Sequence, residues 1–183
     1  DKTAIFETNK LRCWDEFKAA LDEVVDIKDV DYIVMNHTEP DHAGSIANLI
    51  ALNPKITVVA TGTAISFLKE IINHDFKSTA VKNGDRLSLG DRELEFFVLP
   101  NLHWPDTMYT YDAADKLLFT CDSFGSHYSC DGIVRSAVTD EEGYKDATKY
   151  YFDNIIGPYK CPFMVNALKK VKELDVDMIC TGH

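Results

Sequence analysis

One short stretch of the sequence concentrates side chains that can bind metal ions. His37, Glu39, Asp41 and His42 lie within six residues of each other, directly after an apolar run. Glu39 precedes a proline, and a residue before proline is pushed towards an extended conformation. Residues i and i+2 of an extended chain point to the same side, so His37 and Glu39 can reach one ion. Asp41 and His42 can then reach a second ion. Carboxylates among imidazoles suit iron, manganese or zinc better than copper(I).

Three further apolar runs are also followed by a side chain that can bind a metal ion. His103 follows 94–99, Asp122 follows 117–121 and His183 follows 178–180. Rigid α/β scaffolds often place functional groups at strand ends and in the loops after them. Two ions that share a bridging carboxylate would each have enough protein ligands and would keep open positions for a substrate. We therefore predict a two-metal site with the ligands His37, Glu39, Asp41, His42, His103, Asp122 and His183.

Four of these residues have a simpler interpretation when each is considered alone. Asp41 could be the N-cap of the helix that is predicted after it. His103 and His183 could be ordinary loop histidines, and Asp122 could belong to a turn. The density of possible ligands within 37–42 and the three matching strand ends favour the metal site.

The segment 104–107 follows one of the predicted ligands and could hold it in place. Its sequence is Trp-Pro-Asp-Thr, so Asp106 or Thr107 could accept a hydrogen bond from a ligand imidazole. His127 follows Asp122 closely and could be a hydrogen-bond donor beside the site, a pocket wall or a plain surface histidine.

Length and composition indicate one globular domain. The 183 residues are 45% hydrophobic and 27% charged, which is typical of a soluble folded protein. The net charge of −11 argues against a nucleic-acid partner, and no apolar run is long enough for a membrane span. The five cysteines include no C-x-x-C pair, so we expect no disulfide framework or zinc knuckle, and a cytoplasmic location.

The order of predicted elements indicates a layered α/β domain with mixed sheets. Helices and strands alternate in the first half, whereas two hairpins follow in the middle, which a doubly wound parallel sheet would not contain. Predicted strands cover 3–7, 32–36, 56–60, 79–81, 87–89, 94–99, 108–111, 116–120 and 177–180. Predicted helices cover 14–25, 43–52, 64–73, 144–156 and 162–174.

These motifs resemble a known superfamily. Its pattern is H-x-[HE]-x-D-H after a strand, a later histidine followed by proline and Asp or Thr, an aspartate after a strand and a final Gly-His, as in the metallo-β-lactamases. Glu39 at the third position, within Asn-His-Thr-Glu-Pro-Asp-His-Ala-Gly-Ser at 36–45, is similar to the flavodiiron proteins, also called A-type flavoproteins. Asp-Ser-Phe-Gly-Ser-His at 122–127 resembles their segment around the bridging aspartate.

The resemblance implies an αββα sandwich that carries a non-haem diiron centre. One iron would bind His37, Glu39 and His103, the other Asp41, His42 and His183, with Asp122 as the bridge. His127 and Tyr150 are the candidates for catalytic residues in the pocket.

The resemblance also implies cofactors and partners. The reaction would be reduction of O2 to water, of NO to N2O, or both. Electrons would come through FMN from a rubredoxin-like or flavin-reductase donor. A head-to-tail homodimer would set one subunit's FMN beside the other's diiron site. The first strands of the domain and the flavodoxin-like FMN domain that follows it in the family are absent from 1–183, so we expect a partial domain.

Two other functions compete with the redox enzyme. One is a binuclear metallohydrolase acting on a thioester, lactone or phosphodiester, and the other is a degenerate scaffold without activity. Glu39 favours redox chemistry, because a carboxylate in place of an imidazole adds negative charge and an oxygen donor, which suit iron that cycles between Fe(II) and Fe(III). A hydrolase needs only a Lewis acid and a metal-bound hydroxide.

Overall fold

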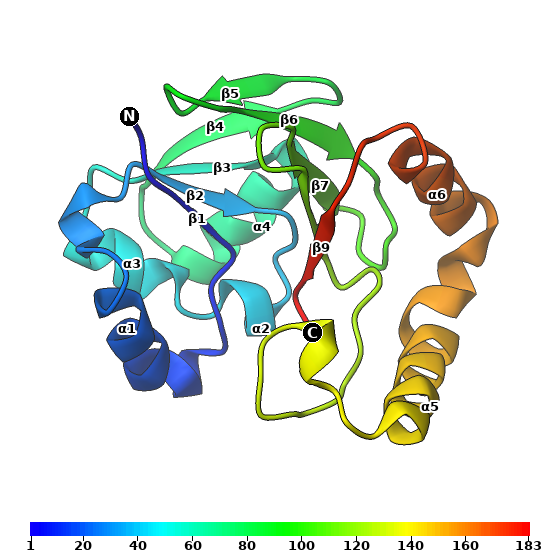
Figure 1. Ribbon diagram of the computed structural model, residues 1–183. Coiled ribbons are helices and arrows are strands. Elements are labelled where there is room, and N and C mark those ends of the chain that lie inside the picture. Colours follow the sequence, from blue (N-terminus) through cyan, green and yellow to red (C-terminus); the bar gives the residue numbers. More distant parts are fainter.

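The chain forms two β-sheets that face each other, with helices on their outer sides (Figure 1). A computed structural model describes residues 1–183. The first sheet has the order β1-β2-β3-β4 and the second the order β5-β6-β7-β8-β9. This arrangement confirms the predicted αββα sandwich.

The first sheet is wholly parallel, and its connections are helices. Its strands are β1 (Ala4–Phe6), β2 (Tyr32–Met35), β3 (Thr57–Thr61) and β4 (Lys77–Val81). The helices are α1 (Trp14–Asp22), α2 (Pro40–Ala43), α3 (Ile46–Leu52) and α4 (Gly62–Ile72). Strand β2 is apolar throughout because both of its faces are covered. Ile33 and Met35 pack in the core beneath the helices, while Val34 packs between the two sheets.

The second sheet is mixed. Strands β5 (Arg86–Ser88), β6 (Glu93–Val98), β7 (Met108–Asp112) and β8 (Leu117–Cys121) are antiparallel neighbours, whereas β9 (Met178–Thr181) runs parallel to β8. A parallel pair needs a crossover connection. Helices α5 (Glu141–Tyr151) and α6 (Val165–Val171) belong to this crossover and cover the outer face of the sheet.

Several predicted helices differ from the observed ones, and α1 and α6 are shorter than the expected 14–25 and 162–174. The expected helix 43–52 is divided into α2 and α3. Helix α2 begins at Pro40, because proline fits the first helical position. The expected helix 144–156 leaves regular α-helix after Tyr151, where the π-helical turn Phe152–Ile156 follows. None of the helices combines the length and apolar character that crossing a membrane requires.

Candidate metal centre

All seven predicted ligands meet at one end of the sandwich, in the loops that follow β2, β6, β8 and β9. Because strands of both sheets end there, residues distant in the sequence become neighbours. Glu39 is extended, with φ −57° and ψ 147°, as its position before Pro40 predicted. Asp41 lies inside the first turn of α2 and is not an N-cap. The ligands fall into two groups that share Asp122.

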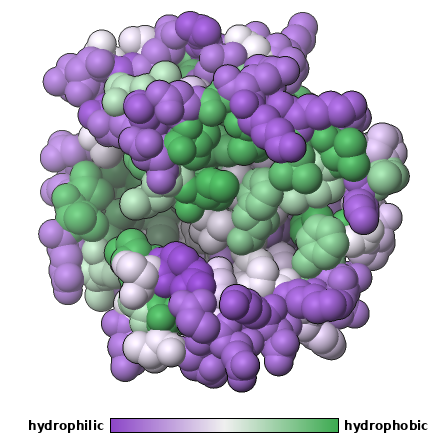
Figure 2. Space-filling model, turned by 45° about the vertical axis from the view of Figure 1, so that its right-hand side comes forward, coloured by the Kyte–Doolittle hydropathy of each residue, from purple (hydrophilic) through white to green (hydrophobic).

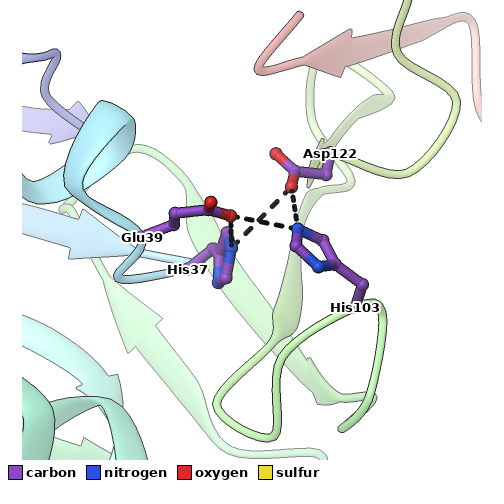
Figure 3. Close-up of side chains that lie close together, drawn as sticks. All are labelled: His37, Glu39, His103 and Asp122. Atoms are coloured by element: carbon purple, nitrogen blue, oxygen red, sulfur yellow. Dashed lines mark hydrogen bonds and ion pairs between the residues drawn. The ribbon is translucent and has the colours of Figure 1, made fainter. Parts of the chain in front are cut away.

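The first group contains His37, Glu39, His103 and one oxygen of Asp122 (Figure 3). Glu39 Oε2 lies 3.3 Å from His37 Nε2 and 3.0 Å from His103 Nε2. Asp122 Oδ2 lies 3.0 Å from His103 Nε2 and 3.7 Å from His37 Nε2. The donor atoms of the four side chains therefore converge on one point.

The second group contains Asp41, His42 and His183. Asp41 Oδ1 lies 3.7 Å from His42 Nε2, and Asp41 Oδ2 lies 3.5 Å from His183 Nε2. The other oxygen of Asp122, Oδ1, lies 2.8 Å from His42 Nε2 and 3.4 Å from His183 Nε2. Each oxygen of Asp122 thus faces a different group, which is the placement that a bridging carboxylate requires.

The donor set fits metal ions. His42 Nε2 and Asp41 Oδ1 are buried without a hydrogen-bond partner, although His42 Nε2 is close to Asp122. Buried polar atoms are normally paired, so this pair of orphaned donor atoms indicates a partner of another kind. Burial alone would raise the pKa of Asp122, but the imidazoles of His103, His183 and His42 hold it well below its usual range. The bridging position therefore remains a carboxylate at any ordinary pH.

A buried carboxylate stands behind His37. Asp106 Oδ1 lies 3.3 Å from His37 Nδ1, and Asp106 Oδ2 accepts hydrogen bonds from Thr38 N–H at 2.8 Å and from its hydroxyl at 2.7 Å. Burial lowers the pKa of His37, but Asp106 more than compensates and raises it to about 9. We predicted that the segment 104–107 would hold His103 in place, with Asp106 or Thr107 accepting from a ligand imidazole. Asp106 does lie against a predicted ligand, but this ligand is His37 and not His103. The hydroxyl of Thr107 donates to the backbone of Leu102 and Trp104.

Glu7, which the sequence analysis did not identify, lies behind His42. Its Oε2 is 3.5 Å from His42 Nδ1, and burial raises the pKa of Glu7 to about 7. One signal could have found it. Strand β1 ends at Phe6 beside β2, so a carboxylate directly after β1 must lie near the ligands that follow β2.

The pocket tyrosine is Tyr151, and the prediction of Tyr150 was wrong. Tyr150 is 72% exposed, whereas Tyr151 is 3% exposed and its ring centroid lies 5.8 Å from that of His183. One residue turns a helix by about 100°, and here this rotation places Tyr151 on the inner face of α5 and Tyr150 on the outer face. His127 is exposed, and its ring centroid lies 4.9 Å from that of His183 and 4.8 Å from that of Tyr151, so its role beside the site stays a prediction.

Fold and site together define a metallo-β-lactamase-like domain with seven carboxylate and imidazole side chains clustered in two groups around Asp122. The family model described as ODP family β-lactamase matches residues 1–183, and the chain belongs to that family. It is 40% identical to the putative diflavin flavoprotein A 2 of Synechocystis, over 100% of this chain and 31% of that protein. It is 38% identical to the flavo-diiron protein FprA2 of Clostridium acetobutylicum, over 100% of this chain and 46% of that protein.

A solved structure gives the same result. The rubredoxin oxygen:oxidoreductase of Desulfovibrio gigas superimposes with a TM-score of 0.92 at 29% identity, covering 99% of this chain and 45% of that one. The predicted resemblance to the flavodiiron proteins is therefore confirmed. The chain spans between 31% and 46% of the length of these relatives.

Proposed function

We propose that this domain is the diiron part of an oxidoreductase that reduces O2 to water, NO to N2O, or both. The observation that carries the proposal is the placement of Asp122, whose two oxygens face two ligand groups that each include a further carboxylate, Glu39 or Asp41. The name of the related Desulfovibrio gigas protein adds support for O2 as substrate.

Seven side chains would hold the two irons. His37, Glu39 and His103 would bind one ion, and Asp41, His42 and His183 the other, with Asp122 between them. Bound iron supplies the one-electron steps between Fe(II) and Fe(III) that reduction of a diatomic molecule needs. The three carboxylates carry negative charge that compensates the charge of the ions, and their oxygen donors favour iron over soft metals.

Tyr151 would supply a proton to the bound diatomic molecule. Its hydroxyl is buried without a hydrogen-bond partner. Burial raises the pKa of this hydroxyl, and the negative charge of Asp122 raises it further, so the proton stays in place at neutral pH. His127 packs edge-on against the ring of Tyr151 and can return a proton from solvent, because it is exposed at the rim.

An apolar hollow leads to this tyrosine. A cavity of about 590 Å³ is lined by Tyr151, Phe124, Phe152, Met164 and Leu168, among others. The face that carries α5 and α6 gathers apolar side chains around a hollow (Figure 2). Such a lining suits a small molecule of low polarity such as O2 or NO, and Tyr151 lies between this cavity and His183.

Electrons would reach the irons from FMN. We propose that the flavin is bound by a flavodoxin-like domain outside residues 1–183, and that a head-to-tail homodimer brings it beside the ligands of the partner chain. A rubredoxin-like protein or a flavin reductase would reduce the flavin.

Single-turnover kinetics tests the function. The protein is loaded anaerobically with two equivalents of Fe(II), which supply two electrons per chain, and mixed with NO or O2, and the consumed gas is measured with an electrode. Two electrons convert two NO to one N2O, whereas one O2 reduced to water takes the electrons of two loaded chains. We expect rapid oxidation of the iron, and Tyr151→Phe should slow it while Tyr150→Phe, at the exposed neighbouring position, should not. If the zinc form instead hydrolysed a thioester, lactone or phosphodiester and the iron form did not react with either gas, the protein would be a hydrolase.

A further inference from the structure

We propose that Glu7 is a positioning residue for the second metal ion: its carboxylate holds His42 so that Nε2 of the imidazole faces Asp41 and Asp122. The inference rests on the proposed function in one respect, since it takes His42 as a metal ligand.

Glu7 is built into the site from outside the ligand segments. It follows β1, and its backbone N–H donates to Val34 O at 2.9 Å. Its φ of 62° lies in the left-handed region, which costs free energy for a residue other than glycine. This backbone conformation turns the carboxylate inward, and the side chain is 13% exposed. The contacts of this largely buried carboxylate must therefore offset the strain of the Glu7 backbone.

All the contacts of the Glu7 carboxylate lead to the site. Oε1 accepts a hydrogen bond from the N–H of Asn36 at 2.5 Å, directly before the ligand His37. Oε2 lies 3.5 Å from His42 Nδ1 and 3.8 Å from the thiol of Cys121, which precedes Asp122. No lysine or arginine pairs with Glu7.

The arrangement repeats at the second group what Asp106 does at the first. His37 and His42 each direct Nε2 into the ligand cluster and Nδ1 towards a carboxylate. Nδ1 of His103 and of His183 faces no carboxylate. Each ion would therefore have one imidazole with a fixed tautomer and ring orientation, Asp106 acting through His37 and Glu7 through His42. Such partners raise the basicity of a ligand imidazole.

A carboxylate is required because two donors must be satisfied. The N–H of Asn36 donates to Oε1 of Glu7. The other oxygen, Oε2, lies 3.5 Å from His42 Nδ1, which also lies 3.5 Å from the sulfur of Cys121. An ionised carboxylate offers an acceptor oxygen to each side. Glutamine has the same size but only one acceptor oxygen, so one of the two donors would face its NH2 group. Glu7→Gln therefore removes one of the two acceptor oxygens of the side chain without creating a cavity.

The test is an anaerobic Fe(II) titration of the full chain against a competing chelator, with the parent, Glu7→Gln and Asp106→Asn compared. It is run at about pH 8.5, where Glu7, whose pKa burial raises to about 7, is ionised. Glu95→Gln is the control, because Glu95 is paired with Arg86 away from the site. We expect Glu7→Gln to lower the affinity for one of the two ions by about 10–100-fold and to leave the affinity for the other unchanged. The variant should also alter the Mössbauer signal of one iron only. Asp106→Asn should affect the other iron.

Two results would overturn the inference, and they differ in their meaning for the proposed function. If the parent bound two irons and Glu7→Gln bound both as tightly, only the role of Glu7 would be wrong. If the parent did not bind two irons, the proposed function would fail as well.

A measurement on the parent covers the case in which the variant does not fold. In the zinc-loaded protein, nitrogen NMR should find the Nδ1 protons of His42 and His37 protected from exchange with water. Exchange at His42 as fast as at His103 would contradict the proposal.

Discussion

Asp122 is the residue on which the two ligand groups depend. Its oxygens lie 2.8 Å from His42 Nε2 and 3.0 Å from His103 Nε2, and it belongs to the loop after β8, away from the 37–42 segment. Removing it leaves each group with three of its ligands and without the charge between the ions.

Asp122→Ala should therefore lose at least one of the two metal ions. Metal analysis after anaerobic reconstitution measures this directly, and Asp91→Ala, at an exposed turn, is a suitable control. The bridging assignment would be wrong if the variant still retained two ions per chain with the affinity of the parent.

Glu39 is the residue that separates iron chemistry from zinc chemistry in this site. Glu39→His recreates H-x-H-x-D-H at 37–42, and both side chains can act as ligands, so we expect the fold to be kept. An imidazole-rich site favours zinc, and the loss of a carboxylate destabilises the ferric state. The variant should shift from iron to zinc when equal Fe(II) and Zn(II) are offered, and its reduction of O2 and NO should fall. Iron binding and turnover equal to those of the parent would show that Glu39 does not set the chemistry.

The side chains that meet at the site could be predicted from the sequence because each follows an apolar run or lies within one short loop. Their metal binding stays a prediction. Two positions required structure. The choice of Tyr151 over Tyr150 as the buried tyrosine depends on how α5 is rotated against the sheet. The position of Glu7 beside the site depends on the pairing of β1 with β2.

At the scale of elements, glycine allows β9 to approach the ligands of α2. A Cβ atom at position 182 would lie 2.6 Å from His42 Cε1 and 3.2 Å from His42 Nδ1. The loop after β9 therefore reaches His42 only because residue 182 has no side chain, and the same loop carries His183.

Gly182→Ala should displace the His42 ring and lower the affinity for the metal ion of the His42 group more than the affinity for the other ion. Overpacking of this kind costs about 1–3 kcal/mol of stability. Thermal unfolding and Fe(II) titration would measure both effects. Gly84→Ala serves as a comparison, because a Cβ at position 84 meets no atom within 4 Å, although its φ of 83° adds some strain. Unchanged binding of both ions in Gly182→Ala would mean that the ring of His42 can move without loss of function.

The strands were predicted more accurately than the helices. Strands β2 and β3 are short and mostly apolar, so they lie within one residue of the expected positions, whereas the polar strand β4 (Lys77–Val81) begins two residues before the expected 79–81. The break between α2 and α3 was missed because it depends on a tertiary contact. A Cβ at Gly44 would lie 2.6 Å from Pro40 O and 2.7 Å from Leu11 N, which brings the segment after β1 against this turn.

At the scale of the whole molecule, the proposed electron path extends beyond these residues. If the flavin lies in another domain, the 183-residue chain should bind two irons but show no steady-state reduction of O2 or NO with NADH and a reductase. Fusion to a flavodoxin-like FMN domain should produce turnover. Steady-state activity of the 183 residues alone, measured with a gas electrode, would show that electrons do not need the flavin.

The most direct test of the dinuclear centre is anomalous diffraction at the iron absorption edge, from crystals of protein reconstituted with Fe(II) in the presence of equal Zn(II). We predict two iron peaks, one beside each oxygen of Asp122, the first among His37, Glu39 and His103 and the second among Asp41, His42 and His183. A single peak, or two peaks that appear at the zinc edge and not at the iron edge, would contradict the assignment of this site as a diiron centre.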